Sequence, residues 1–376
     1  MKTIFISGIT GSIGTQALEV IEELSNNNKI IGGSVNSNWK KLKGIIDKFK
    51  LKFASISNPK ENIPNFYNGC EIFTGIKSTE KAIEKSNPDI SLIATSGAAG
   101  LSHTIKASYH SKRIALANKE SLVLGGDLIL DLFKKNENEV IPVDSEHSAI
   151  FQLLLGENDA QEILLTASGG SLRDIDTENL DNISKKEVLN HPTWSMGKRI
   201  TVDSASMVNK MLEVIEAYYL FKTKNIDIFI NRNSHIHSMV KFKDGVIKMH
   251  YGIPSMKIPI AYALTYPKRI YNFKSPDLIN TEIKFEKPDF NRYPVLKFLD
   301  SILGNQKLHI ALNAADEVAV EYFLNDKIKY IDIISTIEYV INKVERLNLK
   351  INNFDDIFKL DNKCRKIAEE HIKEVQ

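Results

Sequence analysis

The sequence predicts an α/β protein in three parts: an N-terminal Rossmann-like parallel sheet, a central α+β domain and a small C-terminal helical domain. The chain opens with a buried strand, a glycine turn, a helix and a second strand, which is the order that begins a doubly wound nucleotide-binding domain. Strand candidates then follow one another in the second third of the chain, which indicates an antiparallel sheet covered by helices. Helical periodicity dominates after residue 295.

The N-terminal elements follow from short apolar runs and the residues that interrupt them. Residues 2–7 are expected to form a strand, 8–14 a turn, 15–24 a helix and 30–35 a second strand. Further strands are predicted at 53–57, 89–95, 113–117 and 140–143, with helices at 79–86 and 121–134 between them. The resulting sheet should be mostly parallel.

The remaining elements divide the rest of the chain. Strands are predicted at 162–166, 226–230, 235–242 and 246–251, with one helix over 204–221; helices are predicted at 295–303, 309–324 and 331–347. Residues 277–294, a stretch that begins directly after one proline and contains two more, read as a connecting arm. We therefore expect a cofactor-binding domain at 1–144, a catalytic and dimerisation domain at 145–276, this arm at 277–294 and a helical domain at 295–376.

The bulk composition is that of a soluble enzyme. Of the 376 residues, 43% are hydrophobic and 26% charged, and 49 basic against 47 acidic side chains leave a formal charge of +2, so nothing indicates a nucleic-acid partner. The two cysteines lie far apart, which fits a reducing compartment. No apolar run approaches the roughly 18 residues of a membrane helix, and the short apolar start is not a signal peptide. A cytoplasmic location without a membrane partner is the expectation.

Three acids indicate a metal site. Asp144 and Glu146 follow the strand expected at 140–143, and strand alternation would point both the same way, while Glu213 would join them from another element. Oxygen ligands without a histidine or cysteine cluster favour Mg²⁺ or Mn²⁺ over zinc. The competing interpretation is that these acids cap helices and pair with lysines on a solvated surface.

The segment around Glu213 also indicates a phosphate site. Asp203 or Ser204 is expected to cap the helix 204–221, which would place Ser206, Lys210 and Glu213 on one helical face. Ser204, Asn209 and Lys210 would then lie in the first turns, where free N–H groups and the helix dipole attract anions.

The glycine turn indicates a dinucleotide. Gly8, Gly11 and Gly14 have the spacing G-x-x-G-x-x-G between a strand and a helix, so the backbone could approach a pyrophosphate. The acid that NAD-binding chains carry after the second strand is missing, which favours NADP, but no arginine or lysine replaces it directly. Ser37, Asn38 and the nearby lysines at 40 and 41 remain to meet a 2′-phosphate. A glycine turn that serves only helix packing is the alternative.

Long motifs in a fixed order carry a family resemblance. GITGSIG (8–14), ALANKES (115–121), PVDSEHSAIFQ (142–152), TASGGSLRD (166–174), HPTWSMGKRITVDSASMVNKMLE (191–213) and ALNAADEVAVEYFL (311–324) together resemble the 1-deoxy-D-xylulose 5-phosphate reductoisomerase family over nearly the whole chain. The resemblance implies metal-dependent rearrangement and NADPH reduction of 1-deoxy-D-xylulose 5-phosphate to 2-C-methyl-D-erythritol 4-phosphate, in the non-mevalonate isoprenoid pathway. It also implies a homodimer.

The resemblance implies a role for individual residues. Metal ligands would be Asp144, Glu146 and Glu213, and Lys119, Glu146 and Glu213 would be catalytic. The substrate would be bound by Lys119, Ser145, Glu146, Ser168, His191, Trp194, Met196, Ser204, Asn209, Lys210 and Glu213, with Trp194 and Met196 in a flexible lid. NADPH would be bound by Gly8, Thr10, Gly11, Ser12, Ile13, Asn36, Ser37, Asn38, Asn118, Glu120 and Gly197.

The chain departs from the family pattern at five positions. Ile9 stands where the family commonly has serine, Ser37 where it has a base, and Met211 where it has glycine. Ser96 stands where a valine is usual before Gly97, and Ser255 where aspartate is common. The first competing function is an NADP-dependent dehydrogenase that acts on another sugar phosphate without rearranging its skeleton. The second is a nucleotide-sensing protein that has lost catalysis, although the presence of all three acids and Lys210 argues against it.

Overall fold

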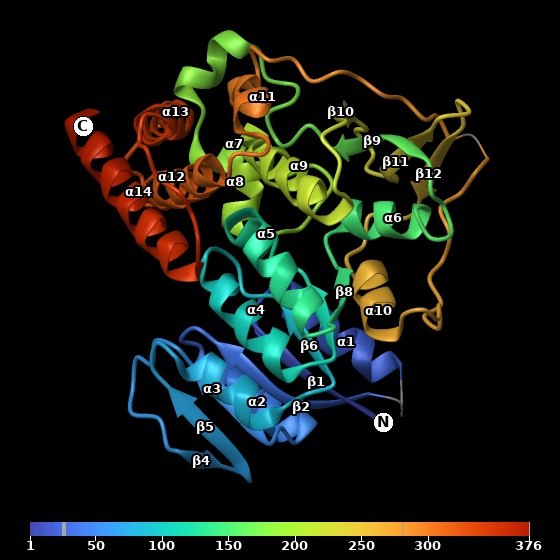
Figure 1. The fold of residues 1–376 in the computed structure, drawn as a ribbon, viewed down its shortest axis with the longest axis vertical. Helices are drawn as coiled ribbons and strands as arrows, with labels where there is room; N and C mark the ends of the chain where they lie inside the picture. The colour runs from blue at the N-terminus through green and yellow to red at the C-terminus, as the bar shows by residue number, and fades with distance from the viewer. Residues whose placement is uncertain (25–27, 280, 376) are drawn as a thin grey trace. The chain divides into compact units, whose positions relative to one another are not determined.

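The computed structural model describes residues 1–24, 28–279 and 281–375, which form two compact units (Figure 1). The first unit comprises Met1–Ser121, Ile129–Ser148 and Ser255–Lys274, and the second comprises Leu122–Leu128, Ala149–Pro254 and Ser275–Gln376. Each unit therefore collects segments that are distant in sequence. The expected domain limits at 144, 276 and 294 stay a prediction.

The first unit contains an eight-stranded sheet in the order β4-β5-β3-β2-β1-β6-β7-β8. All neighbours are parallel except the antiparallel pair β4–β5, as the sequence predicts for a mostly parallel sheet. The strands are β1 Lys2–Ser7, β2 Asn28–Val35, β3 Phe53–Ile56, β4 Phe66–Tyr67, β5 Cys70–Thr74, β6 Ile90–Ile93, β7 Arg113–Leu116 and β8 Glu139–Pro142. The central strand β1 is buried on both faces, where Ile4, Phe5 and Ile6 have no exposed surface.

Helices cover both faces of this sheet. They are α1 Ser12–Glu23, α2 Trp39–Phe49, α3 Ser78–Ser86, α4 Ala99–His110, α10 Lys257–Thr265 and α5 Glu120–Lys135. Helix α5 is interrupted at Gly126, and its residues 122–128 belong to the second unit. Because crossovers between parallel strands are right-handed, α1 and α2 lie on one face and α3 and α4 on the other. The helix expected at 15–24 begins earlier, at Ser12, because Gly11 already occupies the N-cap position.

Helix α10 belongs to the first unit although it follows residue 254 in sequence. It packs beside α1 and against β7 and β8. Arg113 on β7 holds its C-terminal end: the guanidinium donates to the carbonyl oxygens of Ala263 (3.2 Å), Leu264 (3.2 Å) and Tyr266 (2.7 Å) and pairs with Glu139 at 2.6 Å. These carbonyls would otherwise lack helical partners, so a single buried arginine fixes the end of this helix.

The second unit contains a four-stranded sheet in the order β10-β9-β11-β12. Its strands are β9 Ala160–Ala167, β10 Ile226–Ile230, β11 Ile236–Phe242 and β12 Ile247–Tyr251. The sheet is mixed, so the expected antiparallel arrangement is wrong for one pair: β10 runs parallel to β9. The chain between these two strands contains helices, and such a long crossover permits a parallel return, whereas a short turn does not.

Four α-helices and a 3₁₀ helix lie between β8 and β10 in the sequence. These are α6 Ser145–Leu153, η1 Thr177–Asn182, α7 Lys185–Val188, α8 Lys198–Ser206 and α9 Val208–Phe221. The prediction of a single helix over 204–221 is therefore wrong at its N-terminal end, because residues 204–206 belong to α8. Met207 adopts a left-handed conformation (φ 63°) that ends α8 and begins α9, so two helices meet where one was expected.

The C-terminal part of the second unit is helical, as predicted. It contains η2 Pro294–Phe298, α11 Leu299–Ile302, α12 Gln306–Leu324, α13 Ile331–Glu345 and α14 Phe354–Val375, of which α12, α13 and α14 pack against one another. Helix α14 was missed in the sequence because its apolar residues are widely separated by charged ones. Ile357, Leu360 and Cys364 nevertheless recur at helical spacing and are buried.

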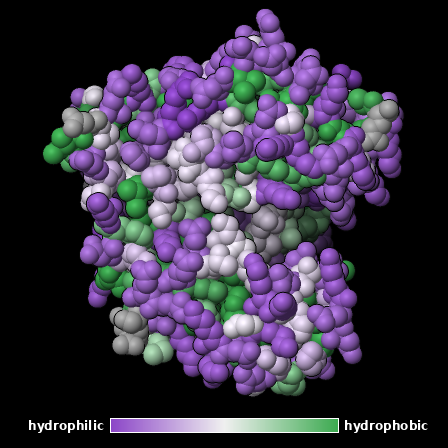
Figure 2. Space-filling model, turned by 180° about the vertical axis from the view of Figure 1, so that it is seen from behind, coloured by the Kyte–Doolittle hydropathy of each residue, from purple (hydrophilic) through white to green (hydrophobic). Residues whose placement is uncertain are grey.

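Polar side chains cover much of one face of the molecule. Figure 2 shows hydrophilic side chains over most of the face turned away from the viewer in Figure 1, with hydrophobic side chains in separate small groups. Among the residues that the structure describes, no helix is both long enough and apolar enough to cross a membrane.

The Arg113 contacts generate a stability prediction. Replacing Arg113 with methionine should lower the free energy of unfolding by about 2 to 4 kcal/mol, because several buried carbonyls lose their donor at once. Urea unfolding monitored by circular dichroism measures this change. Arg269→Met is the control, since Arg269 lies in the same segment but is exposed and stacks on Tyr262. If Arg113→Met lowers the free energy of unfolding no more than the control does, these hydrogen bonds do not stabilise the end of α10.

Candidate functional site

The glycine turn after β1 places open backbone beside the start of α1. A Cβ at Gly14 would lie 2.4 Å from the Gly8 carbonyl oxygen, and one at Gly8 would lie 2.7 Å from that of Ala94, so both positions need glycine. Gly11 caps α1 without a side chain, and Gly11 and Ser12 are exposed. The first N–H groups of α1 therefore point to a position where a pyrophosphate fits.

Ile9, which departs from the family pattern, has a structural explanation. Its side chain is fully buried, and a Cβ at Gly33 would lie 2.5 Å from Ile9 Cδ1. Ile9 therefore fills the space that a glycine in β2 leaves, while its backbone N–H donates to Ser34.

The residues after β2 lie at the start of α2. Asn38 caps this helix by accepting a hydrogen bond from the Lys41 N–H at 3.0 Å, which leaves its amide N–H groups as donors. Ser37 is half-buried, while Asn36, Lys40 and Lys41 are exposed. The structure thus brings together at one helix start the hydroxyl, amide and basic groups that the sequence indicated for a 2′-phosphate.

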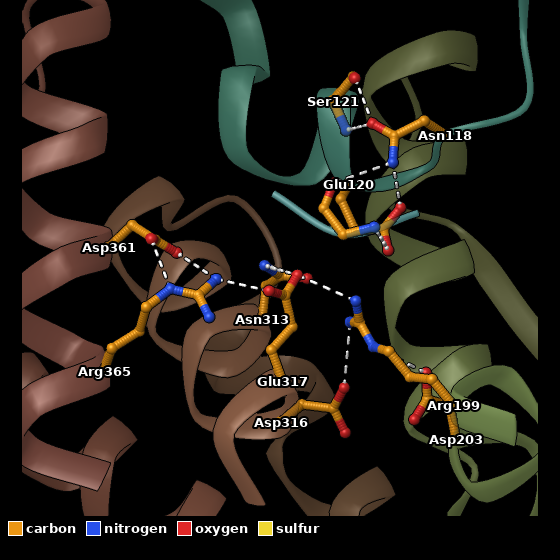
Figure 3. A network of polar contacts seen from close by, with 11 residues as sticks. Asn118, Glu120, Ser121, Arg199, Asp203, Asn313, Asp316, Glu317, Asp361 and Arg365 are labelled. Carbon is orange, nitrogen blue, oxygen red and sulfur yellow. Dashed lines mark hydrogen bonds and ion pairs between the residues drawn. The ribbon is translucent and has the colours of Figure 1, made fainter. Parts of the chain in front are cut away.

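Asn118 and Glu120 form a buried network around Gly97 (Figure 3). Asn118 Nδ2 donates to Gly97 O and to Glu120 Oε2 (2.6 Å), and its Oδ1 accepts from the Ser121 N–H; Glu120 Oε1 accepts from the Gly97 N–H at 2.8 Å. The side-chain amide of Asn118 is fully used by these bonds. We infer that these two residues shape the cofactor side of the first unit chiefly by fixing the Gly97 turn.

Lys119 and Asp144 form an ion pair in the first unit. Lys119 Nζ lies 2.7 Å from Asp144 Oδ2, and both side chains are about nine-tenths buried. Burial would raise the pKa of the Asp144 carboxyl, but the charge of Lys119 and the hydrogen bond from His147 outweigh it and hold that pKa well below its usual range. Asp144 therefore stays ionised.

The placement of Glu146 corrects one expectation. Strand β8 ends at Pro142 and α6 begins at Ser145, so Asp144 and Glu146 do not alternate along a strand. Asp144 instead accepts a hydrogen bond from the Glu146 N–H in the first turn of α6, and Ser145 Oγ donates to Glu146 Oε2 at 2.6 Å. A helix start after a parallel strand, rather than strand alternation, brings the acids together.

His147 is a site residue that the sequence analysis missed. It is fully buried and its Nδ1–H donates to Asp144 Oδ1 at 3.0 Å. Its position three residues after Asp144 was the available signal, because a helix that starts between them places the two side chains together.

Glu213 and its partners form a buried polar cluster in the second unit. The Glu213 side chain is 2% exposed, accepts from Asn209 Nδ2 at 2.5 Å and forms a close ion pair with Lys210, whose Nζ also donates to Thr166 O at 2.5 Å. Asn209 and Lys210 lie in the first turn of α9, which has Met207 as its N-cap. The structure thus confirms that a helix start carries these residues, but places that start at Val208.

Ser204 lies on the other side of Met207, the residue that connects α8 to α9; we call this connection the α8–α9 joint. It belongs to the last turn of α8, so neither it nor Asp203 caps the helix that carries Lys210, and Ser206 is not on that helix. The turn that contains Gly170 packs against it: a Cβ at Gly170 would lie 2.5 Å from Ser204 O. Because a left-handed Met207 breaks the helix, Ser204 and Asn209 flank one joint instead of following one helical face.

Ser168 and His191 are in contact within the second unit. His191 Nδ1 accepts from the N–H groups of Thr193 (3.1 Å) and Trp194 (2.9 Å), so the neutral ring carries its proton on Nε2 and donates to Ser168 Oγ at 3.0 Å. Ser168 Oγ also accepts from the Gly170 N–H, which leaves its own hydrogen to donate. Burial, and then the charge of Arg173, lower the pKa of His191 to about 4.

The segment expected to be a lid lies between α7 and α8. Trp194 and Met196 are half-buried there, and Gly197 is exposed as the N-cap of α8. The rings of Trp194 and of His237 on β11 form an edge-to-face contact, with their centroids 6.1 Å apart. The tryptophan is therefore not a core residue. Met211, by contrast, is fully buried in α9.

The residues present fit a divalent metal and a dinucleotide. The three acids offer oxygen donors, and the carboxylates of Asp144 and Glu213 each lie beside the ammonium group of a buried lysine. The open backbone at the start of α1 and the donors at the start of α2 suit the two phosphate positions of a dinucleotide.

Family models match most of the chain. One described as 1-deoxy-D-xylulose 5-phosphate reductoisomerase matches residues 4–126, and two described as C-terminal domains of that enzyme match residues 140–221 and 251–367. The protein of that name from Pseudothermotoga lettingae is 43% identical over 375 residues, which cover 99% of each chain. The one from Thermotoga neapolitana is 41% identical over 370 residues, covering 98% of this chain and 96% of the relative.

Solved structures of enzymes with the same name have a similar fold. A crystal structure of DOX-P reductoisomerase in complex with NADPH, fosmidomycin and magnesium superposes with a TM-score of 0.92 at 35% identity, covering 100% of this chain and 99% of that one. The enzyme from Zymomonas mobilis in complex with NADPH superposes with a TM-score of 0.86 at 33% identity, covering 99% of both.

The hydrogen bonds of His191 generate a titration prediction. Since the pKa of the folded state, about 4, lies below the ordinary 6.5, the unfolded chain takes up this proton first. The stabilisation linked to His191 should be complete above pH 6.5 and decline as the pH falls toward 4. Nitrogen-detected NMR of the imidazole, assigned with His191→Asn, should show the Nε2–H tautomer and a titration midpoint near pH 4. A midpoint near 6.5 would disprove this environment.

Proposed function

The chain belongs to the 1-deoxy-D-xylulose 5-phosphate reductoisomerase family, and we propose that it catalyses the reaction of that family. The reaction is the metal-dependent rearrangement of 1-deoxy-D-xylulose 5-phosphate and its reduction by NADPH to 2-C-methyl-D-erythritol 4-phosphate, a step of isoprenoid biosynthesis. The observation that carries the proposal is the pairing of a buried acid with a buried lysine in each unit, Asp144 with Lys119 and Glu213 with Lys210.

Asp144, Glu146 and Glu213 are the proposed ligands of one Mg²⁺ or Mn²⁺. When bound, such an ion polarises a carbonyl and its neighbouring hydroxyl and stabilises the negative charge that develops when a carbon–carbon bond breaks. His147 orients Asp144 through its hydrogen bond and so fixes the direction of the ligand oxygen. Glu146 is kept beside Asp144 by the start of α6.

Lys119 has two proposed roles. Its charge keeps Asp144 ionised, and its ammonium group would donate to a substrate hydroxyl or carbonyl oxygen. The rearrangement needs a proton donor and acceptor beside these oxygens, and a buried lysine is suited to that exchange. Ser145, whose hydroxyl already contacts Glu146, would bind a neighbouring substrate hydroxyl.

The substrate phosphate is proposed to bind at the α8–α9 joint and the Ser168 turn. The first N–H groups of α9 and the side chains of Ser204, Asn209 and Lys210 supply donors there. His191 holds the Ser168 hydroxyl so that its free hydrogen points to an acceptor.

The residues proposed to bind NADPH lie in the first unit apart from Gly197. The α1 start with Gly8, Thr10, Gly11, Ser12 and Ile13 would bind the pyrophosphate, and Asn36, Ser37 and Asn38 the adenosine 2′-phosphate. Asn118 and Glu120 would support the nicotinamide half by fixing the Gly97 turn. Trp194 and Met196 would exclude water as the loop closes.

Assembly and location complete the proposal. We propose a homodimer and a cytoplasmic location, on the basis of the family resemblance and the cysteine usage. Light scattering of the purified protein measures the mass: 42.4 kDa per chain predicts twice that value for a dimer.

The metal proposal predicts a specific loss in Glu213→Gln. Substrate-dependent NADPH oxidation with Mg²⁺ or Mn²⁺ should occur in the parent protein and fall by at least about a hundredfold in the variant, because a carboxylate charge is lost from the metal site. Binding of NADPH should be unchanged. Glu338→Gln, at an exposed glutamate of α13, is the control. Near-normal turnover of Glu213→Gln at limiting metal would exclude the three-acid site.

The cofactor proposal predicts a gain in Ser37→Arg. The parent should prefer NADPH to NADH, but by a smaller margin than relatives with a base at this position, since only a hydroxyl, an amide and nearby lysines meet the 2′-phosphate. An added guanidinium should strengthen NADPH binding about tenfold or more, as a charge-assisted contact does, and leave NADH nearly unaffected. Specificity constants for both cofactors measure the effect. A parent that prefers NADH would overturn the assignment.

A further inference from the structure

Arg199 occupies an unfavourable local position. It lies in the first turn of α8, directly after the loop 189–197, with Lys198 before it and Gly197 as the cap. That turn has no acid, and two cations lie at the end of the helix where the dipole is positive. Local preference therefore does not explain an arginine here, and its tertiary contacts must.

Those contacts are ion pairs with α12 and with α8 itself (Figure 3). Arg199 Nη1 lies 3.0 Å from Glu317 Oε1, Nη2 lies 3.3 Å from Asp316 Oδ2, and Nε lies 3.6 Å from Asp203 Oδ2 on the next turn of α8. Asp316 is fully buried and the Glu317 side chain is 15% exposed. Arg199 therefore joins the start of α8 to the middle of α12 through a largely desolvated contact.

Glu317 continues the chain of contacts to the C-terminal helix. Its Oε2 accepts from Arg365 Nη2 at 2.6 Å, and Arg365 is held on α14 by Asp361 at 2.7 Å; Asn313 also donates to Glu317 Oε1. One carboxylate is thus shared by two arginines from different helices. We call Arg199, Glu317, Arg365 and Asp361 the arginine relay.

We propose that Arg199 is a positioning residue for the substrate side of the second unit, and that the arginine relay extends this role to α14. Helix α8 is nine residues long and behaves as a short rod, with the loop 189–197 at its start and Ser204 in its last turn. If the first turn of α8 is held in place, the position of Trp194 in the preceding loop is restricted. The position of Ser204 at the α8–α9 joint is restricted as well. This inference rests on the proposed phosphate site at that joint.

The test reports on the loop independently of turnover. The protein has two tryptophans, so Trp39→Phe leaves Trp194 as the reporter. In this background, Arg199→Met should make Trp194 more accessible to acrylamide and raise the Kd of fosmidomycin with Mg²⁺ about tenfold, as expected when a phosphate-site element loses its register. The Kd of NADPH should change less than about twofold, because Arg199 is assigned to the substrate side. Arg365→Met should act in the same direction but less strongly.

Two comparisons separate positioning from general stability. Arg232→Met is the matched control, since Arg232 also pairs with two acids, Asp174 and Glu286, but is 45% exposed; it should change neither measurement. Arg199→Lys should partly restore the protection of Trp194, because the charge remains while the planar fork is lost. If Arg199→Met does not fold, Glu317→Gln takes its place with the same expected changes.

The outcomes distinguish this inference from the function on which it rests. A parent protein that binds fosmidomycin but does not turn over the substrate contradicts the proposed reaction and leaves the Trp194 result to decide the positioning role. A folded Arg199→Met with unchanged quenching and unchanged fosmidomycin affinity overturns the inference. If Arg365→Met lowers only the melting temperature, the relay to α14 is wrong.

Discussion

The pairing of buried acids with buried lysines is the constraint on which the site depends. A carboxylate removed from water is costly unless a cation or several hydrogen-bond donors compensate its charge. Each unit supplies that cation with its own lysine, Lys119 beside Asp144 and Lys210 beside Glu213. Both lysines are themselves buried, so neither member of a pair can be replaced without leaving a charge uncompensated.

A second shared device is the glycine turn at the end of a strand. In the first unit Gly8 and Gly14 let the turn after β1 close tightly on the start of α1, and in the second Gly170 lets the turn after β9 lie against the last turn of α8. A Cβ at any of these positions would collide with backbone atoms. In the first unit this close packing leaves the start of α1 exposed, and in the second it places the Gly170 turn beside the residues at which α8 ends and α9 begins.

The C-terminal helices support the second unit beyond their own hydrophobic core. Glu317 accepts from arginines on α8 and α14, and Tyr219 on α9 shares a hydrogen bond with the buried His309 of α12 at 3.0 Å. Both helices that flank the Met207 joint are therefore tied to α12. A joint made by one left-handed residue has little stiffness of its own, so contacts from a third helix are what define its geometry.

The sequence by itself determined the parallel sheet, the glycine turn, most helices after residue 295 and the family, because these depend on hydrophobic periodicity and on contiguous motifs. Only the tertiary structure decided the break at Met207, the parallel return of β10, the place of α10 beside α1, and the partners of Arg199. The physical reason is that each of these depends on groups far apart in sequence. Met207 carries no turn signal, the direction of β10 depends on how its crossover packs, and a polar side chain finds its partner only when the helices have met.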